Sequence, residues 1–177
     1  REKEMEELDK GHSPVMYFEK NEEETTRLEV GRLNPSEQSS GRFQVNELNG
    51  TRSVENLHRP VYAEKIDLDH NGTPEWLISE FGHHTGALSL IERKDETLER
   101  RSLLDLPGVI KTEATDLGGD GKLDILVLAA QGREGVYWLK QTDPMRFQTI
   151  PLIEFSPVFG TSWFELIDID QDGDLDI

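Results

Sequence analysis

Short apolar stretches separated by polar turns run along most of the chain, and their lengths are typical of β-strands. Residues 125–130 (Ile-Leu-Val-Leu-Ala-Ala) are apolar without alternation, which predicts a strand covered on both faces. Residues 88–90 (Leu-Ser-Leu) alternate, and residues 98–104 carry several charges, as expected of strands with one face in water. The pattern therefore predicts an all-β protein.

From residue 61 the predicted strands repeat in an order of four. They span residues 61–68, 75–81, 87–92 and 98–104 in the first unit, 109–115, 123–130, 136–140 and 146–152 in the second, and 162–169 and 175–177 in the third. Four short antiparallel strands joined by Gly, Asn, Asp and Pro turns are typical of a β-propeller blade. A β-sandwich with acidic turns is the alternative fold.

The first third of the chain is patterned less clearly. Residues 1–12 mix charges with two apolar residues, which predicts a frayed lead-in with some helix. Strands are predicted at residues 15–18, 27–33 and 43–48. We therefore expect residues 13–60 to form the outer strands of a preceding blade, or else an unrelated cap.

An acidic loop of nine residues connects the first two strands of each unit. The loops begin at Asp67, Asp116 and Asp168, at intervals of 49 (116 − 67) and 52 (168 − 116) residues. Most carry oxygen-bearing side chains at positions 1, 3, 5 and 9, with glycine at position 6 permitting the tight turn. Alternate spacing turns these oxygens toward one point, and hard oxygen ligands suit Ca²⁺ better than zinc or copper.

Each loop would add a backbone carbonyl from position 7. The candidate Ca²⁺ ligands are Asp67, Asp69, Asn71, Thr73 and Glu75 in loop one (67–75), Asp116, Asp120, Lys122 and Asp124 in loop two (116–124), and Asp168, Asp170, Asp172, Asp174 and Asp176 in loop three (168–176). Loop two has Gly118 at position 3, so its affinity should be weaker. An EF-hand is excluded, because position 12 is Ile78 in loop one and Val127 in loop two, where that motif needs a bidentate Glu. Asp/Asn-Gly turns also form without metal, but turn chemistry alone does not demand an acid at position 9.

These loops and strands resemble the FG-GAP/VCBS repeat of integrin-type β-propellers, and Phe81-Gly82 stands where the FG of that family would. The resemblance covers residues 61–177 and predicts a propeller fragment of two to three four-stranded antiparallel blades. These are a blade over 61–106, a blade over 107–160, and the start of a truncated blade over 161–177. Because loop three ends where its outgoing strand should run, we expect the chain to be a piece of a larger protein.

The resemblance also carries functional expectations. It implies structural Ca²⁺, extracellular or periplasmic placement in an exported bacterial protein, and a non-catalytic role in recognising a protein or glycan whose identity is open. Similar repeats are fused to enzymes and cytochromes, so an accessory propeller of a secreted enzyme or redox protein is the alternative. A haem C-x-x-C-H or hydrolase motif elsewhere in the full-length protein would favour that alternative.

The chain has a net charge of −17, and its distribution bears on partners. Residues 61–177 hold 10 basic and 23 acidic side chains, a balance of −13, much of it in the loops. Such a field argues against binding nucleic acid or anionic membranes. There is no cysteine, which excludes disulfides and thiol catalysis, and there is no membrane-spanning run or catalytic signature.

The tryptophans and several histidines could serve either function or packing. Trp76, Trp138 and Trp163 lie on or beside predicted strands, so we expect packing between blades rather than sugar stacking. His83-His84 is expected to be a surface turn, since adjacent side chains on an extended chain point in opposite directions. His70 is the one plausible base within the loops and has no counterpart in loops two and three, which favours a structural loop.

Overall fold

The computed structural model describes residues 13–32, 38–158, 160–173 and 175–177, and every regular element assigned among them is a β-strand. The predicted all-β fold is confirmed, while the lead-in expected at residues 1–12 lies outside the described residues. The strands are β1 (Val15–Lys20), β2 (Glu24–Glu29), β3 (Gly41–Glu47), β4 (Gly50–Leu57), β5 (Pro60–Ile66), β6 (Glu75–Glu80), β7 (Ala87–Lys94), β8 (Thr97–Leu104), β9 (Val109–Thr115), β10 (Asp124–Ala129), β11 (Gly135–Asp143) and β12 (Arg146–Glu154).

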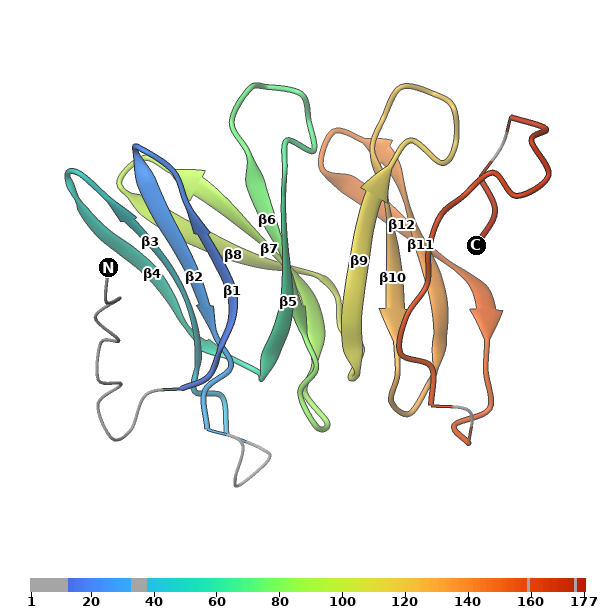
Figure 1. The fold of residues 1–177 in the computed structure, drawn as a ribbon, viewed down its shortest axis with the longest axis horizontal. Coiled ribbons are helices and arrows are strands. Elements are labelled where there is room, and N and C mark those ends of the chain that lie inside the picture. Colours follow the sequence, from blue (N-terminus) through green and yellow to red (C-terminus); the bar gives the residue numbers. More distant parts are fainter. Residues whose placement is uncertain (1–12, 33–37, 159, 174) are drawn as a thin grey trace, which may run out of the picture.

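The strands form three separate four-stranded antiparallel sheets, each a meander of consecutive strands. We call β1–β4 sheet 1, β5–β8 sheet 2 and β9–β12 sheet 3. The sheets stand side by side in chain order (Figure 1), and the first strand of each contacts the first strand of the next. None of the sheets closes into a barrel. This arrangement is a propeller-like fragment, as the sequence predicts.

The second strand of sheets 2 and 3 is buried along its whole length. In β6, Trp76 and Ile78 face sheet 1, where the Trp76 ring centroid lies 5.2 Å from that of Phe43. Leu77 faces the other way, into an apolar cluster shared with sheet 3. Because alternate side chains point to opposite faces, a strand between two sheets must be apolar throughout. The two-sided burial predicted for residues 125–130 is confirmed in β10.

Sheet 1 is a complete four-stranded sheet, where the sequence predicts only the outer strands of a blade, or else a cap, at residues 13–60. Pattern analysis misses β4 because only Val54 and Leu57 of its eight residues are buried, and the others are polar or glycine. A short turn joins β1 to β2. In it the Asn21 side-chain oxygen accepts hydrogen bonds from the backbone N–H groups of Glu23 and Glu24, both at 2.8 Å.

The C-terminal segment differs from the two strands expected at residues 162–169 and 175–177. Its described residues form a single antiparallel bridge, between Ile167 and Asp176. Phe164 packs against the outer face of β10, and its carbonyl accepts a hydrogen bond of 2.6 Å from Lys111. Phe164, together with Leu166 packed against the same cluster, holds the segment close to sheet 3 without the ladder of hydrogen bonds that a strand requires.

The three tryptophans have three different environments. Trp76 is fully buried between sheets 1 and 2, as expected, and Trp138 is half-buried against the apolar cluster on the outer face of sheet 3. Trp163 is 59% exposed, so the expectation of packing between blades is wrong for it. The Lys111 ammonium lies 4.0 Å from the centroid of the Trp163 ring and supplies a cation–π contact instead.

A glutamate lies three residues before each acidic loop, as Glu64, Glu113 and Glu165. Glu64 joins sheets 2 and 3, because its carboxylate accepts hydrogen bonds from the Thr112 hydroxyl at 3.0 Å and the Ala114 N–H at 3.1 Å. Burial raises the pKa of Glu64, and its two hydrogen bonds only partly offset that effect.

Trp76→Ala should lower the free energy of unfolding by about 3–5 kcal/mol, because it removes a large side chain from a closed core. Trp163→Ala is the matched control and should cost about 1 kcal/mol or less, the scale of an exposed cation–π contact. Urea unfolding followed by far-ultraviolet circular dichroism would measure both. Equal losses would contradict the assignment of Trp76 to the interface between sheets.

Glu64→Gln should change how stability depends on pH. The folded pKa of Glu64 is raised, so the folded protein keeps a proton that the unfolded chain releases, and stability falls as pH rises above the unfolded value. The glutamine variant lacks this fall, so its stability relative to the native chain should improve between pH 4 and pH 7. Parallel curves of unfolding free energy against pH would contradict this. Any lost hydrogen bond adds only a constant offset.

Candidate functional site

The three acidic loops project from the same side of the molecule (Figure 1). Loop one joins β5 to β6, loop two joins β9 to β10, and loop three is closed by the bridge between Ile167 and Asp176. The repeated sequence pattern therefore has a repeated position in the fold.

The loops share an unusual backbone conformation at positions 4 and 6, where φ is positive. A left-handed φ at position 6 explains the glycine there, and position 4 accepts any residue that tolerates this region. The φ values are 58° at His70, 65° at Gly119 and 63° at Gln171 for position 4, and 87° at Gly72, 81° at Gly121 and 98° at Gly173 for position 6. Position 4 is His70, Gly119 or Gln171, and the turn has the same shape with each of these residues.

The aspartate at position 1 organises each turn through its two oxygens. One oxygen accepts the N–H of position 5 and the other accepts the N–H of position 6. The distances are 3.0 and 2.8 Å for Asp67, 3.0 and 2.8 Å for Asp116, and 3.1 and 3.1 Å for Asp168. These bonds hold the turn from within, as Asx turns do.

The acid at position 9 links the end of each loop to its beginning. Glu75 accepts the Leu68 N–H at 2.9 Å, and Asp176 accepts the Ile169 N–H at 2.9 Å, which is position 2 in both loops. In loop two the donor is instead position 3, because Asp124 accepts the Gly118 N–H at 3.1 Å. The requirement for an acid at position 9, which turn chemistry did not explain, therefore has a structural origin in all three loops.

Carboxylates converge in loops one and three. In each, the acids at positions 1, 3 and 9 offer oxygens that all lie within 4.8 Å of one another, and these are Asp67, Asp69 and Glu75 in loop one and Asp168, Asp170 and Asp176 in loop three. Burial, together with the charges of Asp69 and Asp67, raises the pKa of Glu75. Mutually repelling oxygens at this spacing fit a hard divalent cation such as Ca²⁺.

The other predicted ligands are less uniform. In loop one, the Asn71 side-chain oxygen accepts the Thr73 N–H at 2.7 Å. In loop three, the Asp172 N–H donates to Asp168 and Asp170, and Asp174 lies outside the described residues. Within the part of the chain that the structure describes, loop two forms no cluster of three converging carboxylates. Its Asp116 and Asp124 occupy positions 1 and 9 as predicted, but position 3, which supplies the third acid in loops one and three, is Gly118.

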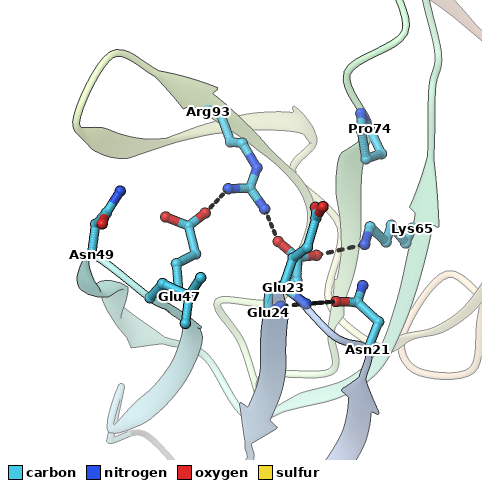
Figure 2. A pocket seen from close by; sticks show the side chains of 9 residues that line it. Asn21, Glu23, Glu24, Glu47, Asn49, Lys65, Pro74 and Arg93 are labelled. Carbon is cyan, nitrogen blue, oxygen red and sulfur yellow. Dashed lines mark hydrogen bonds and ion pairs between the residues drawn. The ribbon is translucent and has the colours of Figure 1, made fainter.

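A cleft of about 490 Å³ opens beside loop one, between sheets 1 and 2 (Figure 2). Pro74 of loop one and Asn21 of the short β1–β2 turn lie at its edges. Inside, Glu24 forms ion pairs with Lys65 at 2.6 Å and with Arg93, and Arg93 also pairs with Glu47. The cleft is therefore lined by charges that satisfy one another and tie sheet 1 to sheet 2.

The cations of the cleft also have an aromatic partner. Lys65 and Arg93 lie 5.7 and 4.9 Å from the centroid of the buried Trp76 ring. Burial alone would raise the pKa of Glu24, but its pairs with Lys65 and Arg93 hold it below the usual range. Sequence analysis missed this network because Glu24 lies 41 residues from Lys65 and 69 from Arg93.

His83 and His84 lie on the connection between β6 and β7, with ring centroids 4.0 Å apart. His84 is exposed, while His83 is half-buried and its Nδ1 lies 3.2 Å from the Gln131 side-chain nitrogen. This placement agrees with the expected surface turn.

Comparison with known families gives a match that contains loops two and three. A model of the FG-GAP-like repeat matches residues 116–177, from the first residue of loop two to beyond loop three. This part of the chain is similar to an FG-GAP-like repeat. The resemblance drawn from the sequence is thereby confirmed over these residues. Residues 61–115 lie outside this match, but sheet 2 has the same order of strands as sheet 3, and loop one has the same turn geometry as loops two and three.

Curated proteins and solved structures yielded no match to the chain. Among the described residues, no helix has the length and apolar character needed to cross a membrane.

Proposed function

We propose that this chain is a non-catalytic, propeller-like FG-GAP module stabilised by Ca²⁺ bound in its acidic loops. The observation that carries the proposal is the convergence of three carboxylates at the same positions of loops one and three. Asp/Asn-Gly turns occur without metal, but the repeated grouping of like charges destabilises a loop unless a cation compensates it.

In this proposal each ion clamps two strands of one blade. The acid at position 1 follows the first strand, and the acid at position 9 begins or adjoins the second. A cation bound between them joins the strand ends, and water completes its coordination shell of six to eight oxygens. The ligands are consumed in holding the turn, so the metal has a structural role and supplies no reaction centre.

The loop-bearing side is the proposed recognition surface for a protein or glycan. Loops on a rigid scaffold are common binding elements. Here all three project from one side of the molecule, and loop one lies beside the charged cleft of Figure 2. Loops without the bidentate Glu of an EF-hand fit the affinities of about 10⁻⁴–10⁻³ M found in extracellular modules. Such affinities match placement outside the cytoplasm, in an exported protein.

Ca²⁺ should raise the melting temperature of the chain, and EGTA should reverse the increase. When the free Ca²⁺ concentration is a hundred times the dissociation constant, one site adds about 2.7 kcal/mol to the free energy of unfolding. Differential scanning calorimetry would measure the shift, with Mg²⁺ as the control. Mg²⁺ should stabilise less, because it demands near-octahedral geometry and dehydrates reluctantly. A melting curve indifferent to both Ca²⁺ and EGTA would refute the proposed function.

The loops should contribute unequally to this stabilisation. Asp67→Ala should abolish more of the Ca²⁺-dependent increase in melting temperature than Asp116→Ala, because loop one has converging acids and loop two does not. Both changes remove an acceptor of two N–H groups, so the two variants are matched in their metal-free cost. Calorimetric titration with Ca²⁺ measures the difference. The reverse order would show that loop two is the stronger site.

A further inference from the structure

Loop two departs from the other loops at two positions. Position 3 is Gly118, where loops one and three have Asp69 and Asp170. Position 7 is Lys122, where loop one has Thr73. Loops one and two have three carboxylates each, because loop two has Asp120 at position 5 where loop one has Asn71. The glycine removes the carboxylate at position 3, and the lysine makes the net charge of loop two −2 (−3 + 1), against −3 for loop one.

The acid at position 9 of loop two is fully engaged by the backbone. Asp124 is 1% exposed, and its two oxygens accept the Gly118 N–H at 3.1 Å and the Gln141 N–H at 2.7 Å. Its counterpart in loop one, Glu75, accepts the Leu68 N–H through one oxygen. A carboxylate that already accepts two N–H groups has its charge partly compensated by the backbone without a metal ion.

The ammonium group of Lys122 stays close to the loop. It donates to the Thr142 carbonyl at 3.1 Å and lies 3.5 Å from a carboxylate oxygen of Asp120. Thr142 belongs to β11, so the lysine also connects loop two to the neighbouring hairpin of its own sheet. Loop two therefore contains a covalently attached cation beside the acid at position 5, together with a hydrogen bond that keeps this cation in place.

We propose that Lys122 is the built-in counter-cation of loop two, so that loop two keeps its shape without metal and Ca²⁺ binds loops one and three. This inference rests on the proposed function for the two metal sites. In this proposal, positions 3 and 7 of a loop determine whether a bound metal ion or an internal lysine compensates its acids.

There is room for a side chain at Gly118, so an acid can be introduced at position 3 of loop two. A Cβ atom built at Gly118 would lie 3.5 Å from an Asp124 carboxylate oxygen, which is an ordinary van der Waals contact, and the backbone there is not in the left-handed region. An aspartate at this position would thus place its side chain next to the acid at position 9, as in the converging clusters of loops one and three.

A reciprocal exchange tests the proposal on the whole chain. Bound Ca²⁺ is counted by equilibrium dialysis over free concentrations of about 10⁻⁵–10⁻² M, a range that brackets extracellular modules. The native chain should bind two ions. Gly118→Asp combined with Lys122→Thr should raise the number to three, and Asp69→Gly combined with Thr73→Lys should lower it to one. Three ions on the native chain, or no change in either double variant, would overturn the proposal.

A second measurement concerns Lys122 without metal. In EGTA, Lys122→Gln should lower the melting temperature by about 1–3 °C, the range of an exposed ion pair in a chain of this size, and Lys122→Arg should restore it. An unchanged melting temperature for Lys122→Gln would overturn the role of the lysine. Failure of every variant to bind Ca²⁺ would overturn the proposed function and the assignment of loops one and three, while the EGTA melts would still decide the role of Lys122.

Discussion

The structure depends on one constraint, which is that the second strand of a sheet must be covered on both of its faces. In β6 and β10 every residue is buried, so neither strand can be stable in an isolated sheet. Burial of a large apolar side chain contributes about 1.5–3 kcal/mol, and β6 and β10 present such side chains to both neighbours. The sheets consequently form a stack in which each one completes the core of the next. The ion pairs of the cleft add charge complementarity at one edge of the same interface.

The ends of the acidic loops are set by strand pairing within each unit. Ile66 pairs with Glu75, Thr115 with Asp124 and Ile167 with Asp176, so the first and last acids of each loop are brought together. Internal N–H donors to Asp67, Asp116 and Asp168 already shape each turn. A cation would therefore stabilise a conformation that the backbone already prefers. This separates the shape of the loops, which all three share, from their proposed demand for a metal, which we infer to differ with the residues at positions 3 and 7.

Sequence reasoning was most reliable where the pattern was periodic. Apolar runs predict the four strands in each of sheets 2 and 3 and the two-sided burial of β10. The spacing of the acids predicts the positions of the loops. It failed where long-range contacts decide the outcome. β4 has too few apolar residues to be detected, and Trp163 has an apolar side chain whose exposure depends on how far the C-terminal segment pairs. The bonds from the Gln141 and Gly118 N–H groups to Asp124 could not be predicted either, because ligand spacing does not reveal which donors compete for a carboxylate.

The backbone and side chain of Gln141 together give the neighbouring loops a shared frame. The Gln141 N–H binds Asp124 of loop two, and its buried side-chain amide donates to the carbonyls of Leu123 at 2.7 Å and of Leu68, in loop one, at 3.4 Å. Leu68 in turn donates to Glu75. An unbroken series of hydrogen bonds and peptide units thus runs from the last acid of one loop to the last acid of the next. Rigidity is therefore a property of adjacent blades acting together, and a force applied to one loop by a bound partner is distributed over two sheets.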